Sequence, residues 1–143
     1  MASQFYLVHH HIKPNMSEAW WEIIGGQTEE DSKEYEKSVM EKGFFNHSFM
    51  PMGPDGPMYC VWEVKDGISA SEFQDFIDGP DGVNFGLVAL NNNVMQLNLE
   101  LTGGQTPVSY THLRAHETPE QRGWRRGRVK KKGGGGGGGG GGG

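Results

Sequence analysis

The segment Phe5–Ile12 constrains the fold more than any other part of this chain. It reads Phe-Tyr-Leu-Val-His-His-His-Ile, the densest run of strand-forming residues, and Pro14 follows it closely. Neighbouring side chains of a strand point to opposite faces. We therefore predict a central strand with helices against one face and a cavity at the other. The two faces carry Tyr6, Val8, His10 and Ile12 on one side and Phe5, Leu7, His9 and His11 on the other.

Helical and strand patterns alternate along the rest of the chain up to residue 101. Apolar residues at helical spacing predict helices within 15–43, with a break or bend at Gly25 and Gly26, and within 69–79. Aromatic or alternating runs predict strands at 44–50, 58–64 and 94–101. The order β-α-β-β-α-β predicts an α+β fold of the ferredoxin-like type, with an antiparallel sheet in the order 4-1-3-2 and both helical regions on one face.

Capping residues mark the helix starts, and alternation assigns the faces of the last strand. Ser69 with Glu72, and Asn15 with Glu18, match the capping-box spacing, and Thr28 precedes three acidic residues. The run 91–93 reads as a turn, so the last strand is expected to begin at residue 94. In that phase Met95, Leu97 and Leu99 face the helices, whereas Gln96 and Asn98 face the cavity.

The chain from Pro107 onward does not resemble a folded protein. Residues 107–118 read Pro-Val-Ser-Tyr-Thr-His-Leu-Arg-Ala-His-Glu-Thr, which resembles a translated transposase-type sequencing-library adapter. A basic stretch and eleven glycines, Gly133 to Gly143, follow. A glycine tract buries nothing and has no preferred backbone conformation. We therefore expect one ferredoxin-like domain, residues 1–106, and a disordered, non-biological tail, residues 107–143.

Without that tail the chain is strongly acidic. The whole chain has 13 Lys and Arg and 18 Asp and Glu, a net charge of −5, and the tail holds eight of the basic and two of the acidic residues. Residues 1–106 therefore carry five basic and 16 acidic side chains, a net charge of −11. This charge argues against nucleic acid or an anionic membrane as a partner.

The cysteine content and the first residues indicate the compartment. Cys60 is the only cysteine, so no intrachain disulfide can form, and its neighbours on the strand predict a buried small hydrophobe. The start Met-Ala-Ser-Gln has no charged and apolar leader, and no apolar run is long enough to span a membrane. We expect a cytoplasmic protein.

Aromatic side chains on the helix-free face predict a partner. Phe45, Phe49 and Tyr59 are expected there by alternation along their strands. Water is a poor cover for such a patch, and a second copy of the chain is the simplest alternative. We therefore expect a homodimer.

Three short motifs carry a family resemblance. Tyr6-Leu7-Val8-x-x-His11, His47-Ser48 and Tyr59-Cys60-Val61-Trp62-Glu63 are similar to the pattern of small ferredoxin-like domains that include nickel-binding bacterial proteins. The wider group is the dimeric α/β-barrel superfamily, which also contains cofactor-independent monooxygenases and muconolactone-isomerase-type enzymes. The resemblance implies a dimeric barrel and a site in its cavity, but the chain departs from the pattern at its Pro/Gly-rich hairpin and at 82–90.

A polar site is expected on the helix-free face. Two histidines at i and i+2 project in parallel about 6.5–7 Å apart, a separation that one metal ion can bridge. We predict a Ni or Zn site at His9 and His11, assisted by Glu63, with His47 in support or at a second site. The alternative is that these histidines only line a wet interface. The other residues predicted to line the cavity are Phe45, Phe49, Tyr59, Gln96 and Asn98.

Three functions remain open from the sequence. The first is a dimeric binding protein that holds a small ligand or a divalent metal, Ni or Zn. The second is a cofactor-independent monooxygenase or isomerase in which His9 or His11 is the general base. The third is a structural dimer without a ligand. No organic cofactor is indicated, since the chain lacks a phosphate-binding glycine loop, and His10 is expected to be only structural.

Overall fold

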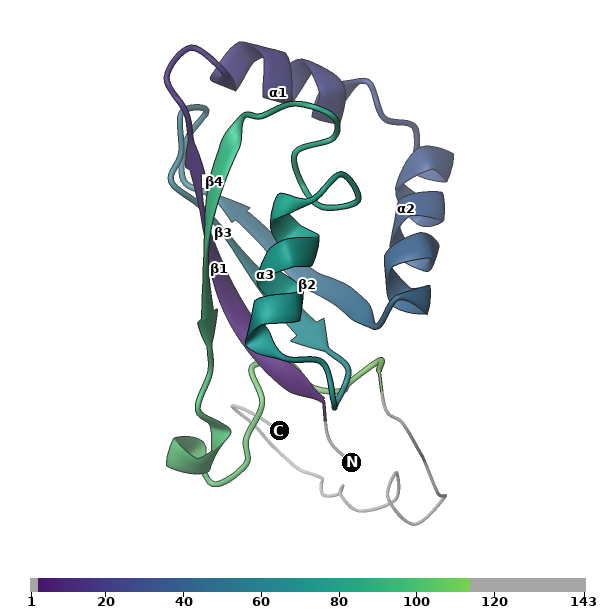
Figure 1. The fold of residues 1–143 in the computed structure, drawn as a ribbon, viewed down its shortest axis with the longest axis vertical. Coiled ribbons are helices and arrows are strands. Elements are labelled where there is room, and N and C mark those ends of the chain that lie inside the picture. Colours follow the sequence, from purple (N-terminus) through teal and green to yellow (C-terminus); the bar gives the residue numbers. More distant parts are fainter. Residues whose placement is uncertain (1–2, 114–143) are drawn as a thin grey trace.

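The computed structural model describes residues 3–113. The described chain forms one antiparallel sheet of four strands with three α-helices against one of its faces (Figure 1). The predicted α+β fold with an antiparallel sheet is confirmed. In chain order the elements are β1 (Gln4–Ile12), α1 (Ser17–Gly25), α2 (Glu29–Glu41), β2 (Phe44–Pro51), β3 (Met58–Val64), α3 (Ala70–Asp78), β4 (Leu90–Gln96) and the 3-10 helix η1 (Leu99–Thr102).

The sheet has the order β2-β3-β1-β4, which reads 4-1-3-2 when counted from the β4 edge. β1 and β3 are the inner strands, so the prediction of a central first strand is confirmed. The helix face carries the buried side chains of Tyr6, Val8 and Trp62. We call the opposite face, which none of the helices within residues 3–113 covers, the open face.

Capping explains where two of the helices begin. Thr28 and Asp31 exchange side-chain and backbone hydrogen bonds at the start of α2, and Ser69 and Glu72 do the same at the start of α3. Each cap of this kind stabilises a helix by about 1 kcal/mol. The capping box expected at Asn15 is absent from the described structure, because α1 starts one residue after Met16, which makes no side-chain cap.

A β-bulge in β2 changes the faces of its second half. Asn46 pairs with Trp62 and Ser48 pairs with Val61, so His47 is an extra residue opposite a regular β3. Phe49 then pairs with Cys60 and contacts Trp20 on the helix face. The prediction that Phe49 lies on the open face is wrong, because strict alternation holds only until the bulge.

The last strand starts earlier than predicted, and its faces are reversed. Leu90 already pairs with Ile12, and residues 91–93 continue the ladder instead of forming a turn. Met95 pairs with Leu7 on the open face, whereas Gln96 pairs with Tyr6 on the helix face. Asn98 lies beyond the end of β4 and caps η1. The predicted cavity positions of Gln96 and Asn98 are therefore wrong.

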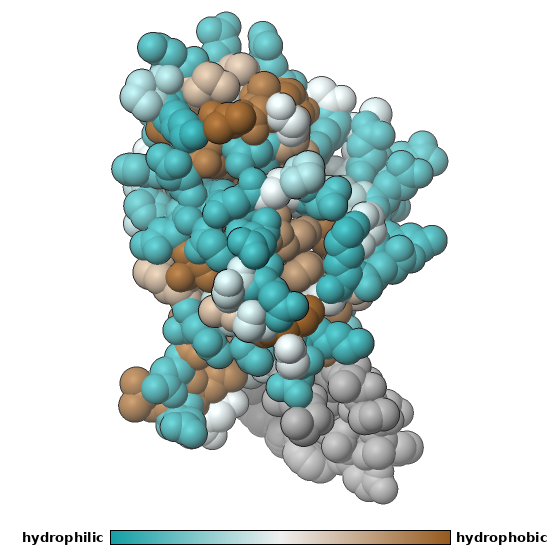
Figure 2. Space-filling model, in the orientation of Figure 1, coloured by the Kyte–Doolittle hydropathy of each residue, from teal (hydrophilic) through white to brown (hydrophobic). Residues whose placement is uncertain are grey.

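The hydrophobic core fills the space between the helix face and the helices. Buried aromatic rings meet between α3 and the sheet, where Phe73 of α3 contacts Tyr6, Phe44 and Trp62. Hydrophobic surface is visible over α1 and the neighbouring loop (Figure 2), which contains the exposed Val88. In residues 3–113 no helix has the length and apolar character needed to cross a membrane.

Residues 106–113, here called the C-terminal segment, reach the open face through His112 and Leu113. Leu113 is buried, the His112 ring stacks on Phe45 at a centroid distance of 4.1 Å, and the Ser3 hydroxyl donates to the Leu113 carbonyl at 2.9 Å. Two residues of the expected disordered tail, His112 and Leu113, therefore contact the domain. The remainder of that prediction, residues 114–143, lies outside the described residues.

Candidate functional site

The two predicted metal-binding histidines lie side by side on the open face of β1. The ring centroids of His9 and His11 are 5.2 Å apart, and the His9 ring stacks on Tyr59 at 4.9 Å. His9 is half-buried and His11 is exposed. This cluster offers two imidazoles and one phenol.

Glu63 and His47 form a separate pair at the other end of the open face. Nε2 of His47 lies 2.7 Å from Oε1 of Glu63. Glu63 pairs with Phe5 on β1, four residues from His9, which is about 13 Å along the strand. The antiparallel register places Tyr59 opposite His9. The prediction that Glu63 assists His9 and His11 is therefore wrong.

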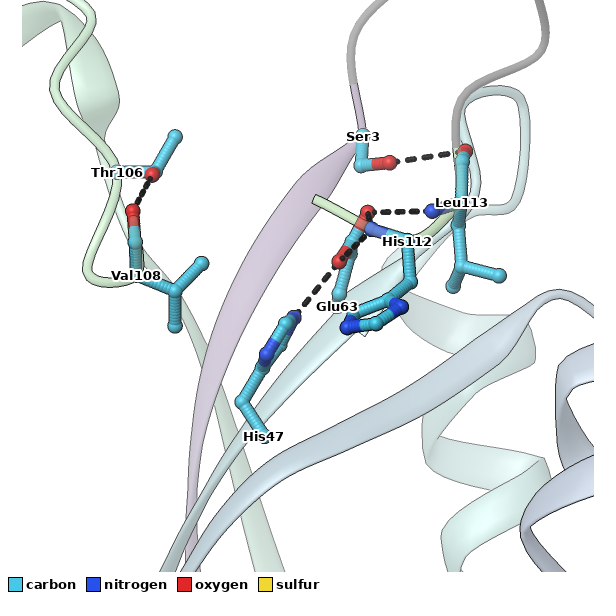
Figure 3. A network of polar contacts seen from close by, with 7 residues as sticks. All are labelled: Ser3, His47, Glu63, Thr106, Val108, His112 and Leu113. Atoms are coloured by element: carbon cyan, nitrogen blue, oxygen red, sulfur yellow. Dashed lines mark hydrogen bonds and ion pairs between the residues drawn. The ribbon is translucent and has the colours of Figure 1, made fainter. Parts of the chain in front are cut away.

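The carboxylate of Glu63 is fully buried beneath the C-terminal segment (Figure 3). The backbone N–H of His112 donates to it at 3.0 and 3.1 Å and that of Leu113 at 2.9 Å. Burial alone would raise the pKa of Glu63, but the contacts from Ser3, the two backbone N–H groups and His47 outweigh it, so the pKa is lowered. Glu63 is therefore an ionised acceptor of hydrogen bonds.

The predicted metal ligands do not assemble into one centre. Within residues 3–113, no group of three or more His, Cys, Asp or Glu side chains is placed to hold a metal ion. Protein zinc sites use three or four protein ligands. His9 and His11 provide two, and His47 with Glu63 lies elsewhere on the sheet.

A cavity of about 220 Å³ lies on the other side of the sheet, between its helix face and α1 and α2. Most of its wall is apolar or aromatic, and Phe49, which is 42% exposed, lies at its boundary with solvent. Side chains from α1, α2, β2, β3 and the loop before β4 contribute to the wall, including Trp20, Tyr35, Phe49, Cys60, Trp62 and Phe85.

His10 brings an imidazole into this apolar cavity. It is 1% exposed, and its Nδ1 lies 2.6 Å from Oδ1 of Asn92. Nδ2 of Asn92 donates to the Asp78 carboxylate at 3.0 Å. Since a carboxylate only accepts, Asn92 must present its amide nitrogen to Asp78 and its oxygen to His10, and Nδ1 of His10 must carry the proton.

The second nitrogen of His10 is left as a free acceptor. Nε2 of His10 is buried and has no hydrogen-bond partner in the described part of the chain. Burial lowers the pKa of His10, and the neighbouring His9 also lowers it, while the Asn92 hydrogen bond opposes the shift. The imidazole is therefore neutral at neutral pH, with its Nε2 lone pair available.

Three other polar side chains of the cavity wall have a hydrogen-bond acceptor nearby. The indole N–H of Trp20 donates to the Val83 carbonyl at 2.9 Å, and the Tyr35 hydroxyl donates to the Gly82 carbonyl. The Trp62 indole N–H makes no hydrogen bond of ordinary geometry among residues 3–113, although the weakly accepting Cys60 sulfur is close to it. Burial raises the pKa of the Cys60 thiol to about 11, so it is not a nucleophile at neutral pH.

Sequence reasoning missed His10 and the cavity beside it. His10 was expected to be only structural because Val8 and Ile12 flank it on its face of β1. A signal was nevertheless present, since a histidine on a fully apolar strand face requires a partner for each ring nitrogen.

The predicted domain can now be compared with known proteins. The family model described as "Domain of unknown function (DUF8652)" matches residues 5–105. The chain belongs to the DUF8652 family. Apart from Gln4, the match includes all four strands, and it ends before His112 and Leu113, so the DUF8652 domain contains Glu63 but not the residues that cover it. No curated protein and no solved structure matches the chain.

Proposed function

We propose that this DUF8652 domain is a binding protein for a small, mostly apolar molecule, and that the molecule occupies the cavity between the sheet and α1 and α2. The observation that carries the proposal is the buried Nε2 of His10, which has no hydrogen-bond partner in residues 3–113 and belongs to a side chain in the wall of the apolar cavity. An unsatisfied buried acceptor costs about 1–3 kcal/mol, and a ligand would recover that free energy.

The cavity has a suitable size for one aromatic molecule. An apolar cavity of about 150 Å³ holds a benzene ring. The cavity here has about 220 Å³, which fits a bicyclic ring system. Phe49 is exposed on one side and contacts Trp20 and Trp21 on the other, so it marks the side from which a ligand can enter.

The finer fold assignment, a ferredoxin-like dimeric α/β barrel, belongs to the same proposal. Leu7 and Val61 are half-buried on the open face, and Met95 is exposed there. By register, the only charged side chain of the described strands on this face is the buried Glu63. Since the C-terminal segment resembles an adapter sequence, a second copy of the domain is the natural cover for the surface that this segment occupies.

The binding proposal is tested by NMR titration of the ¹⁵N-labelled full chain with naphthalene. The indole N–H signals of Trp20 and Trp62 report on the cavity because both rings line it. Both signals should shift along a saturable curve. Cys60→Leu, which reduces the cavity, should weaken binding. Unchanged indole signals up to the solubility limit of naphthalene would show that the cavity is not a binding site.

A further inference from the structure

We infer that the ligand of this cavity is a planar aromatic or enolic alcohol, bound with its O–H directed at Nε2 of His10. The inference rests on the proposed function and adds the chemical class of the ligand. Three observations support it: the fixed tautomer of His10, the way the other cavity groups are used, and the position of the imidazole in the fold.

The tautomer of His10 is fixed by two side chains that lie outside the cavity wall. Asp78 of α3 accepts from Asn92 at 3.0 Å, and Asn92 accepts from Nδ1 of His10 at 2.6 Å. Gln74 also donates to the Asn92 backbone carbonyl at 2.9 Å, which ties β4 to α3 beside this chain of contacts. In the other tautomer, Nδ1 of His10 would carry no proton and would face Oδ1 of Asn92, so two hydrogen-bond acceptors would meet. The nitrogen of His10 that remains a hydrogen-bond acceptor is therefore Nε2, on a side chain of the cavity wall.

The remaining polar groups do not satisfy that acceptor. The indole of Trp20 donates to Val83, and the hydroxyl of Tyr35 donates to Gly82. Trp62 has the Cys60 sulfur nearby, so its N–H places a smaller demand on a ligand. The amide side chains of Gln27 and Asn46 also line the cavity and can donate or accept, so His10 is the buried acceptor of the wall that needs one donor on the ligand.

The position of the imidazole limits the shape of the ligand. His10 pairs with Met58, and Trp62 lies four residues further along β3, about 13 Å away along the strand. Between them the wall is made by Cys60 and aromatic side chains of the helix side. A flat ring system with a hydroxyl at one end fits this arrangement, whereas a charged ligand would lose its hydration in an apolar cavity.

A matched ligand series tests the inference. Dissociation constants of the full chain are measured by the same NMR titration for naphthalene, 2-naphthol and 2-methoxynaphthalene. The three share one ring system, but only 2-naphthol donates a hydrogen bond. We expect 2-naphthol to bind about five- to tenfold more tightly than the other two. The ¹⁵N signal of His10 Nε2 should shift with 2-naphthol and not with naphthalene.

The variant His10→Phe provides the control, since it keeps an aromatic ring and removes the acceptor. The advantage of 2-naphthol should vanish in this variant while naphthalene still binds. Equal affinities of the wild type for all three ligands, with no change at Nε2, would refute the inference and leave the proposed function intact. Absence of binding by all three would refute the proposed function itself. The wild-type comparison decides the question even where the variant does not fold.

Discussion

Replacement of Cys60 by leucine tests whether the cavity between the sheet and α1 and α2 is present in solution. Cys60 is 2% exposed, lies on the helix face of β3 and lines the cavity of about 220 Å³. Leucine has two more non-hydrogen atoms in its side chain, and each buried methylene contributes about 0.8 kcal/mol. If the added atoms enter empty space, the free energy of unfolding should rise by about 1–1.5 kcal/mol. For a domain of this size that corresponds to a gain of about 4–8 °C or slightly more in melting temperature.

Val8→Leu is the matched control for this change. Val8 is the cross-strand neighbour of Cys60, lies on the same face and is 0% exposed, but it is not part of the cavity wall. An added methylene there must displace packed atoms, which costs about 1–3 kcal/mol. The two leucine substitutions should therefore have opposite effects on stability.

Urea unfolding followed by tryptophan fluorescence measures both variants against the wild type. The midpoint should rise for Cys60→Leu and fall for Val8→Leu, with similar denaturant slopes. A loss of stability in both variants, of similar size, would refute the reasoning, because it would mean that the space beside Cys60 is as tightly packed as that beside Val8.

Three further predictions address the rest of the molecule. A chain that ends at Thr106 uncovers Phe45, and we expect it to be a dimer by light scattering at micromolar concentration; a monomeric mass would count against the barrel assignment. Calorimetry with Ni and Zn should give weak binding that His11→Ala reduces, since His9 and His11 offer two neighbouring imidazoles to an ion; equal, negligible heats from both proteins would end the metal hypothesis. Because burial lowers the pKa of His10 in the folded state, the unfolded state binds the proton first, so urea stability should fall as the pH drops below about 6.5, and His10→Phe should reduce that fall. The pKa of Glu63 is also lowered, so the stability that Glu63 contributes is lost in a separate pH range, at lower pH.

Local signals in the sequence predicted most of the elements. The capping pair Ser69 and Glu72 marks the start of α3, and the dense run at Phe5 marks the central strand, because both depend only on residues close in sequence. Burial of Cys60 followed from its apolar neighbours on β3. Such features need no knowledge of the partner strands.

The faces of the edge strands could not be predicted in the same way. The start of β4 depends on the edge of β1, which supplies hydrogen bonds to residues 91–93 although asparagine is a poor strand former. The bulge at His47 depends on its pairing with β3, and it moves Phe49 to the other face. The candidate site was misplaced for the same reason, because the position of Glu63 relative to His9 is a property of register and not of composition.

The bulge also allows the residues on one face of β2 to change in evolution without changing those on the other face. In a regular strand, an in-frame deletion of one codon turns every later side chain to the opposite face. Here Asn46 and Ser48 already pair with adjacent residues of β3, so loss of the His47 codon would leave Phe49 beside the cavity and remove only one of the partners of Glu63, the imidazole. Relatives of this chain could therefore gain or lose the histidine in a single mutational event without altering the cavity between the sheet and the helices.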